Sequence, residues 1–219
     1  MLSASALGCV RGERVVFAGL GFRAGAGDAL VLTGANGSGK SSLLRLLAGL
    51  ARPAAGALTW DGVDIRDDPG RHAARCHFVG HLDALKPALT AGEQLAFWAC
   101  VRSGGSERRR QRREQAEAAL AAFGIAHLAD MPVRFLSAGQ RRRVALARVL
   151  TAPAPLWLLD EPATALDADA VRRLDDVIAR HRADGGLVIL SMHGGARPPG
   201  ALSLDLDAFA APAPAVVGC

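Results

Sequence analysis

The sequence contains little cysteine and no tyrosine, and it has no long apolar run. Its cysteines show neither the close pairs of a zinc site nor the density of a disulfide scaffold, which favours a reducing, cytoplasmic compartment. They are Cys9, Cys76, Cys100 and Cys219. No run approaches the roughly 20 apolar residues that a membrane-spanning helix needs. If the protein serves a membrane, we therefore expect it to act from the membrane surface.

The overall composition is typical of one sizeable globular domain. Of the 219 residues, 50% are hydrophobic and 21% are charged, which is enough to form a core. A net charge of +5 would suit nucleic acid, anionic lipid or a phosphate ligand. Most of the excess positive charge is arginine in an alanine-rich sequence, a bias that genomic base composition can produce. The charge therefore does not indicate which of these partners the protein binds. Residues 1–9 lack the basic and apolar segments of a signal peptide, and we expect them to lead into a strand.

Local patterns divide the chain into parts. Residues 14–22 and 57–65 have the composition of strands, and Asp61-Gly62 inside the second predicts a tight hairpin, so we expect an antiparallel β subdomain. Residues 89–150 are rich in alanine and arginine with helical spacing, which predicts a helical insertion. We expect a single domain over residues 1–205, followed by an Ala/Pro-rich tail over 206–219.

Continuous apolar runs predict a parallel sheet in the centre of the domain. Residues 29–33, 156–160 and 187–191 are such runs, which is typical of strands buried on both faces. Leucine spacing predicts a helix over residues 40–50, directly after a glycine-rich loop. Together these patterns indicate an α/β fold with a three-layer core.

The glycine-rich loop has the complete pattern of a phosphate loop, in the context of strand, loop and helix that this motif requires. Its glycines let successive backbone N–H groups converge on a phosphate. Lys40 is expected to reach the β- and γ-phosphates of ATP, and the Ser41 hydroxyl to bind Mg²⁺. The loop consists of Gly34, Ala35, Asn36, Gly37, Ser38, Gly39, Lys40 and Ser41.

Two carboxylates end the apolar run at 156–160, where open α/β sheets place catalytic groups. Asp160 is expected to hold the magnesium through water, and Glu161 to polarise the water that attacks the γ-phosphate. The alternative is an ordinary acidic strand end. The phosphate loop upstream favours the catalytic interpretation.

The pentapeptide at residues 136–140 opens the last helix of the insertion. The Ser137 hydroxyl and the Gly139 N–H at a helix N-terminus can form an anion site without a basic side chain. The alternative is a plain N-cap with Ser137 as the capping residue. Both interpretations can hold at once.

Leu136-Ser137-Ala138-Gly139-Gln140 resembles the signature pentapeptide of ATP-binding-cassette (ABC) ATPases, and further matches cover nearly the whole chain. The resemblance implies a phosphate-loop NTPase core with a helical signature subdomain. It also implies that the signature of one molecule completes the ATP site of a second copy. Asp167 resembles the loop that crosses this dimer seam. His193, after the run at 187–191, matches the switch histidine and is expected to contact the γ-phosphate.

Two positions depart from the general ABC pattern. His81 replaces the glutamine that usually contacts magnesium and the attacking water, unless Leu82 is taken as its place. The aromatic residue that usually stacks on adenine is absent, and Arg11 falls near that position. A guanidinium can also stack on a base, so we expect Arg11 to contribute to nucleotide binding.

Residues 80–90, beginning Gly80-His81, are similar to one ABC subfamily, the ATP-binding haem-exporter subunit of bacterial cytochrome c maturation. Residues 136–148 and 155–162 look like the same subfamily. This resemblance implies a peripheral protein on the cytoplasmic face of the inner membrane, paired with integral membrane subunits. In that system ATP hydrolysis is thought to drive release of the haem-loaded chaperone.

Other classes remain as alternatives. A transporter ATPase for another substrate would share all the core motifs. An ABC protein of ribosomes or DNA would normally show two cassettes or a long coiled coil, and this chain has one phosphate loop and no sustained heptads, so no nucleic acid is expected. A regulatory module should lack a base at Glu161. We interpret the arginine run at 108–113 as a solvated helix face, and His72, Cys76 and His77 as structural rather than as haem ligands.

Overall fold

A five-stranded parallel sheet forms the centre of the computed structural model, which describes residues 1–105, 108–192, 194 and 197–210. Three of its strands, β3 (Ala29–Thr33), β7 (Leu156–Leu159) and β8 (Leu187–Ser191), are almost completely buried, as the continuous apolar runs predict. The order across the sheet is β6 (Cys76–Val79), β7, β8, β3 and β9 (Leu202–Asp205).

Alternate residues of these strands pack into two different hydrophobic clusters, one on each face of the sheet. Leu156 and Leu158 pack with α1 (Lys40–Leu47) and with the antiparallel sheet, whereas Trp157 and Leu159 pack with α6 (Ala168–Ala183) and the helical region. This alternation follows from the two-residue period of a strand. The predicted α/β fold with a three-layer core is therefore confirmed. Helix α1 ends before the predicted residue 50, because Gly49 leaves the helix with a φ of 72°.

A second, antiparallel sheet covers the α1 side of the core. The predicted hairpin is confirmed: Thr59 pairs with Asp64 and Trp60 with Val63. Asp61 and Gly62 turn the chain with φ values of 51° and 82°, the two positive angles that a tight type I′ turn requires. The order is β2 (Arg14–Ala24), β1 (Leu2–Arg11), β4 (Ala55–Trp60) and β5 (Val63–Asp64), so the first residues form a strand as expected.

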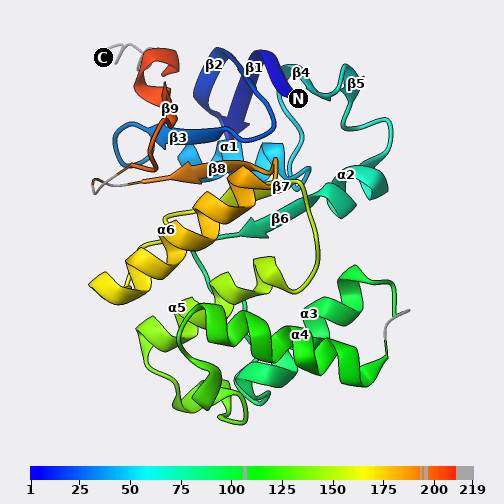
Figure 1. Ribbon diagram of the computed structural model, residues 1–219. Coiled ribbons are helices and arrows are strands. Elements are labelled where there is room, and N and C mark those ends of the chain that lie inside the picture. The colour runs from blue at the N-terminus through cyan, green and yellow to red at the C-terminus, as the bar shows by residue number, and fades with distance from the viewer. Residues whose placement is uncertain (106–107, 193, 195–196, 211–219) are drawn as a thin grey trace.

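The described residues between 89 and 150 form helices and loops and contain no strand. In Figure 1 this helical region lies apart from the antiparallel sheet, on the other side of the parallel sheet. Its helices are α3 (Ala91–Arg102), α4 (Arg109–Ala122) and α5 (Ala138–Ala147), with 3-10 turns at Ala126–Leu128, Val133–Phe135 and Arg148–Leu150. Helix α2 (Pro69–Arg75) leads into β6. Within the described ranges, no helix is both long and apolar enough to cross a membrane.

The tail was predicted to begin at residue 206, and this boundary is too early. Strand β9 pairs with β3, and the 3-10 helix η4 (Leu206–Phe209) follows it. Leu206 is completely buried in the core shared by the two sheets. The proline and alanine content around this segment gave no sign of these contacts, because they are made with residues far away in the chain. Residues 211–219 lie outside the described part of the chain.

Candidate functional site

The phosphate loop joins β3 to α1, and its backbone needs glycine. Gly34, Gly37 and Gly39 have φ values of 128°, 84° and 103°, which side chains rarely tolerate. A Cβ on Gly39 would lie 2.6 Å from a methyl of Val16 and 2.9 Å from the Phe17 ring. Gly39 is also the N-cap of α1 and makes no side-chain cap. The N–H groups of the first turn therefore remain available to an anion.

Lys40 lies across this loop and is largely buried, with only 6% of its surface exposed. Its Nζ donates hydrogen bonds to the carbonyls of Gly34, at 2.7 Å, and Ala35, at 2.9 Å. The Ser38 hydroxyl is buried and has no hydrogen-bond partner among the described residues. A buried ammonium and a buried hydroxyl on a concave loop are suited to bind phosphate oxygens.

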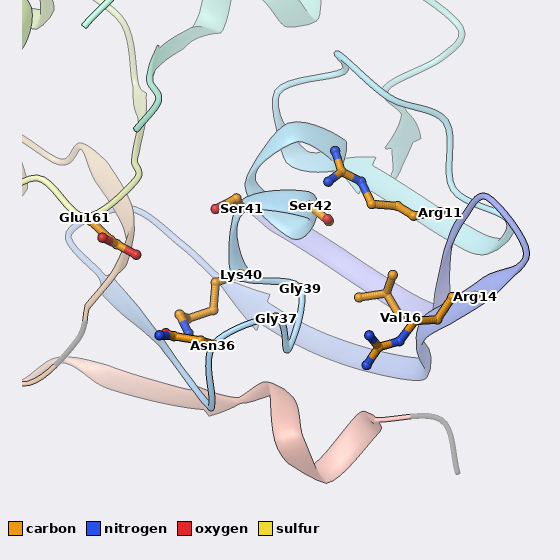
Figure 2. Close-up of a pocket in the computed structure, with 10 residues that line it drawn as sticks. All are labelled: Arg11, Arg14, Val16, Asn36, Gly37, Gly39, Lys40, Ser41, Ser42 and Glu161. Carbon is orange, nitrogen blue, oxygen red and sulfur yellow. The ribbon is translucent and has the colours of Figure 1, made fainter. Parts of the chain in front are cut away.

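The loop forms one wall of a cavity of about 570 Å³ (Figure 2). Arg11 and Arg14 line it at one end and Glu161 at the other, with Lys40 between them. The structure thus brings together the predicted Arg11, the phosphate loop and Glu161. Arg14 was not predicted. It pairs directly with Arg11 across β1 and β2, so the hairpin register was the signal that could have identified it.

Asp160 and Glu161 follow β7 next to the end of β8. Asp160 is buried, and its Oδ1 accepts a hydrogen bond of 2.7 Å from the Ser191 hydroxyl. The Glu161 N–H donates in turn to the Ser191 Oγ, at 2.8 Å. Glu161 has a φ of 47°, an uncommon value for a residue other than glycine. Ser191 was missed, although it ends an apolar run at the same sheet edge.

His81 lies beside Glu161, with 3.9 Å between its Nδ1 and the Glu161 Oε2. The imidazole is mostly exposed, at 65%. Leu82, the alternative for the glutamine position, is 80% exposed. Of these two residues, His81 is the one that faces Glu161.

Ser137 is the N-cap of α5 and forms a capping box. Its hydroxyl accepts a hydrogen bond from the Gln140 N–H at 3.2 Å, and its own N–H donates to the Gln140 side chain at 2.8 Å. A Cβ on Gly139 would lie 2.8 Å from the Ala165 carbonyl. Glycine at this position therefore permits the close approach of the loop between β7 and α6. Asp167 caps α6 by accepting from the Ala170 N–H at 2.8 Å.

Among the described residues that line the cavity, none belongs to the pentapeptide, and Asp167 is also not among them. The structure therefore places the predicted site residues in two groups within one chain. The phosphate loop, His81, Asp160 and Glu161 follow the ends of parallel strands, and Arg11 lines the cavity from the antiparallel sheet. Ser137, Gly139 and Asp167 form a second group. His193 lies outside the described residues.

His72, Cys76 and His77 are buried. His72 and His77 each bond a backbone carbonyl at 2.8 Å, on Leu47 and Ala152 respectively. Burial lowers the pKa of His77 to about 4 and raises the pKa of Cys76 to about 12. Groups of three or more His, Cys, Asp or Glu side chains placed to hold a metal are absent from the described ranges.

Four arginines of the run at 108–113 are exposed, whereas Arg112 is half-buried and donates to the Cys100 Sγ on α3 at 2.8 Å. Arg110 contacts Glu114 at 2.8 Å and Arg113 contacts Glu117 at 2.9 Å, each one turn further along. Such pairs stabilise a solvated helix. The exposed arginines agree with the interpretation of a solvated face, but Arg112 does not, because it packs against α3.

Comparisons with known proteins agree with these motifs. The family model described as "ABC transporter" matches residues 17–164. The "Cytochrome c biogenesis ATP-binding export protein CcmA" of Paramagnetospirillum magneticum is 57% identical over 208 residues, 95% of this chain and 94% of the relative. The protein of the same name from Rhodospirillum rubrum is also 57% identical, over 92% of this chain and 84% of its own.

Solved structures share the fold. A putative ABC transporter ATP-binding protein from Pyrococcus furiosus superposes with a TM-score of 0.80 at 22% identity, covering 96% of this chain and 99% of its own. The ATP-binding cassette MJ0796, solved as a dimer in a post-hydrolysis state bound to ADP and Pi, gives a TM-score of 0.80 at 25% identity, with 89% and 88% of the two chains covered.

Proposed function

Because this chain belongs to the ABC transporter family of ATPases, we propose that it is the ATP-hydrolysing subunit of an ABC complex in cytochrome c biogenesis. ATP binding and hydrolysis would drive haem export or release of a haem-loaded chaperone. The names of the relatives that match over more than 90% of the chain support the cytochrome c part. The similarity of residues 80–90 to the haem-exporter subfamily supports the haem part.

One observation carries the ATPase proposal: Glu161 lines the same cavity as the phosphate loop. The volume of that cavity is within the range of small-ligand sites. The α1 amides and Lys40 would bind the phosphates of ATP, while Arg11 and Arg14 lie where the base and ribose would extend. Glu161 would then act on the water that attacks the γ-phosphate, since a carboxylate at this position can accept its proton.

The residues present also fit a magnesium ion. The Ser41 hydroxyl and the Asp160 carboxylate are hard oxygen donors of the kind that Mg²⁺ prefers. Ser191 fixes one oxygen of Asp160, and such a contact orients a ligating carboxylate. Mg²⁺, when bound, would neutralise phosphate charge. His81, beside Glu161, would take the place of the usual glutamine, and His193 is proposed to contact the γ-phosphate.

The second group of residues supports a homodimer. Ser137 and Gly139 lie at the start of α5, where a helix N-terminus can bind an anion, yet they do not line the cavity of their own chain. We propose that they complete the cavity of a second copy, with Asp167 at the seam. Integral membrane subunits would hold the dimer at the cytoplasmic face of the inner membrane.

The substitution Glu161→Gln tests the ATPase proposal. Turnover should fall by about 10²- to 10⁴-fold, because general-base catalysis contributes on this scale, while ATP binding is kept and a closed dimer accumulates. ATP hydrolysis and size-exclusion chromatography with ATP measure these effects. Glu117→Gln, an exposed carboxylate on α4, is the matched control. Normal turnover in Glu161→Gln would contradict the mechanism.

The cytochrome c part needs a test in cells. Deletion of the gene should abolish the covalently attached haem of c-type cytochromes, detected by haem staining, and the wild-type gene should restore it. Complementation with Glu161→Gln should fail. Undiminished staining in the deletion strain would reject this role and favour an ABC ATPase for another substrate.

A further inference from the structure

Arg142 is a buried arginine on α5, and it faces the loop that follows β7. Only 4% of its surface is exposed. A guanidinium has five N–H donors, and here each has an acceptor. Nη2 donates to the carbonyls of Asp160, at 2.7 Å, and Glu161, at 2.9 Å. Nη1 donates to the Gly80 carbonyl, at 2.9 Å, and to the Asp83 carboxylate, at 3.2 Å, and Nε donates to the Pro162 carbonyl, at 3.3 Å.

Burying a charged guanidinium costs desolvation free energy that an apolar side chain of similar volume would not. A buried charge destabilises a fold unless it is paired and fully hydrogen-bonded, and apolar side chains often serve stability better. Arg148, a buried arginine just after α5, makes a comparison. It donates to the Phe78 carbonyl and lies over the Trp98 ring, 5.1 Å from its centre. It bridges β6 and α3, and within the described part of the chain its guanidinium makes no hydrogen bond to residues 160–162.

The bonds of Arg142 hold a strained stretch of backbone. Glu161 has a φ of 47° and precedes Pro162, which disfavours the right-handed helical region for Glu161. Residues in sparsely populated regions persist only when their surroundings enforce them. On one side the Glu161 N–H is bonded to Ser191, and on the other side its carbonyl is bonded to Arg142.

The same guanidinium also holds the turn that carries His81. Gly80 precedes His81 and Asp83 follows it by two residues, and both are bonded to Nη1 of Arg142. The turn and the Glu161 loop are thereby fixed to one planar group. This arrangement accounts for the 3.9 Å approach of His81 to Glu161.

We propose that Arg142 is a positioning residue for ATP hydrolysis, which sets the Glu161 loop and the His81 turn relative to each other and ties both to the signature helix. Ser137 begins the helix on which Arg142 lies. A shift of α5 when Ser137 meets the second copy would therefore reach Glu161 of its own chain directly. This inference rests on the proposed ATPase function.

The test compares Arg142→Met, Arg142→Lys and Arg148→Met in the full chain. Arg142→Met should lower kcat by about 10- to 100-fold, as a misplacement of about 1 Å does, with ATP affinity within about threefold of wild type since Arg142 does not line the cavity. Arg142→Lys should recover part of kcat, because an ammonium can still bond some of the carbonyls. Arg148→Met should lower the melting temperature but keep kcat below that temperature.

Asp83→Asn serves if Arg142→Met does not fold, since it weakens one contact of Arg142 and leaves the backbone carbonyls bonded. It should lower kcat by a few-fold at unchanged ATP affinity. Wild-type kcat in the folded Arg142 variants, or an equal loss in Arg148→Met, would overturn the proposal. Wild-type protein and Glu161→Gln are measured alongside. Absence of hydrolysis by the wild-type protein would instead contradict the ATPase function itself.

Discussion

Helices α1 and α5 both begin at sites predicted to bind phosphate, but their first turns are built differently. The N-cap of α1 is Gly39, which has no side chain to offer the helix. The N-cap of α5 is Ser137, whose capping box with Gln140 satisfies donors at both ends of the box. The first helix start therefore leaves its amides to a ligand, whereas the second is capped by its own residues.

This difference in capping agrees with different roles for the two helix starts in binding nucleotide. The α1 start lies in a cavity with Lys40, Arg11 and Arg14, so one chain alone supplies positive charge for a triphosphate. The α5 start has a helix dipole and a hydroxyl but lies outside that cavity. We infer that α1 binds ATP in the monomer and that α5 contributes only when a second chain presents its nucleotide.

Lys40→Ala should produce the largest loss at the α1 start. It removes charge-assisted hydrogen bonds to phosphate, each worth about 1.5–3 kcal/mol, so ATP affinity should fall by about 100-fold in calorimetric titration. Lys86→Ala is the matched control, since Lys86 lies over the Phe97 ring and these are the two lysines of the chain. Unaltered ATP binding by Lys40→Ala would break the assignment of the phosphate loop.

Ser137→Asp and Ser137→Ala separate capping from anion binding at α5. Aspartate caps a helix as well as serine does, but its charge should repel a γ-phosphate. Ser137→Asp should therefore keep the wild-type melting temperature and monomer ATP affinity while ATP turnover falls at least about tenfold. Ser137→Ala should lose about 1 kcal/mol of folding stability.

If Ser137→Asp hydrolyses ATP at the wild-type rate, Ser137 is only a cap, and the contrast between the two helix starts disappears. Thermal melting, ATP titration of the monomer and steady-state hydrolysis give the three readouts. Dimer formation with ATP in the double variant Glu161→Gln, Ser137→Asp gives a fourth readout. The closed dimer that accumulates in Glu161→Gln alone should not form when Ser137 is also replaced by aspartate.

Features encoded by adjacent residues could be predicted from the sequence. The phosphate loop and the Asp61-Gly62 turn depend on glycine at fixed positions, and the parallel strands are continuous apolar runs. The structure confirmed the hairpin, the parallel core and the strand, loop and helix around Gly34 to Ser41.

Contacts between distant residues could not be predicted in this way. Arg142 sits within three consecutive arginines, which suggests a solvated surface. The clue was its spacing from Ala145 and Leu146, which places it on the apolar side of α5. The burial of Leu206 and the contact of Asp207 with the phosphate loop, 172 residues earlier, have no local pattern at all.

Asp207→Ala should give the smallest loss of ATP affinity among the substitutions at the α1 start. It tests whether the segment after β9 stabilises the phosphate loop. The Asp207 carboxylate accepts hydrogen bonds of 2.9 and 3.2 Å from the Ala35 N–H. Losing about 1 kcal/mol of hydrogen bonding to the loop should weaken ATP affinity by about threefold to fivefold. Asp207→Asn keeps an acceptor and should change affinity by less than about twofold. Tighter ATP binding by Asp207→Asn would show instead that the carboxylate acts on the nucleotide by its charge, so that α1, like α5, depends on more than its own first turn.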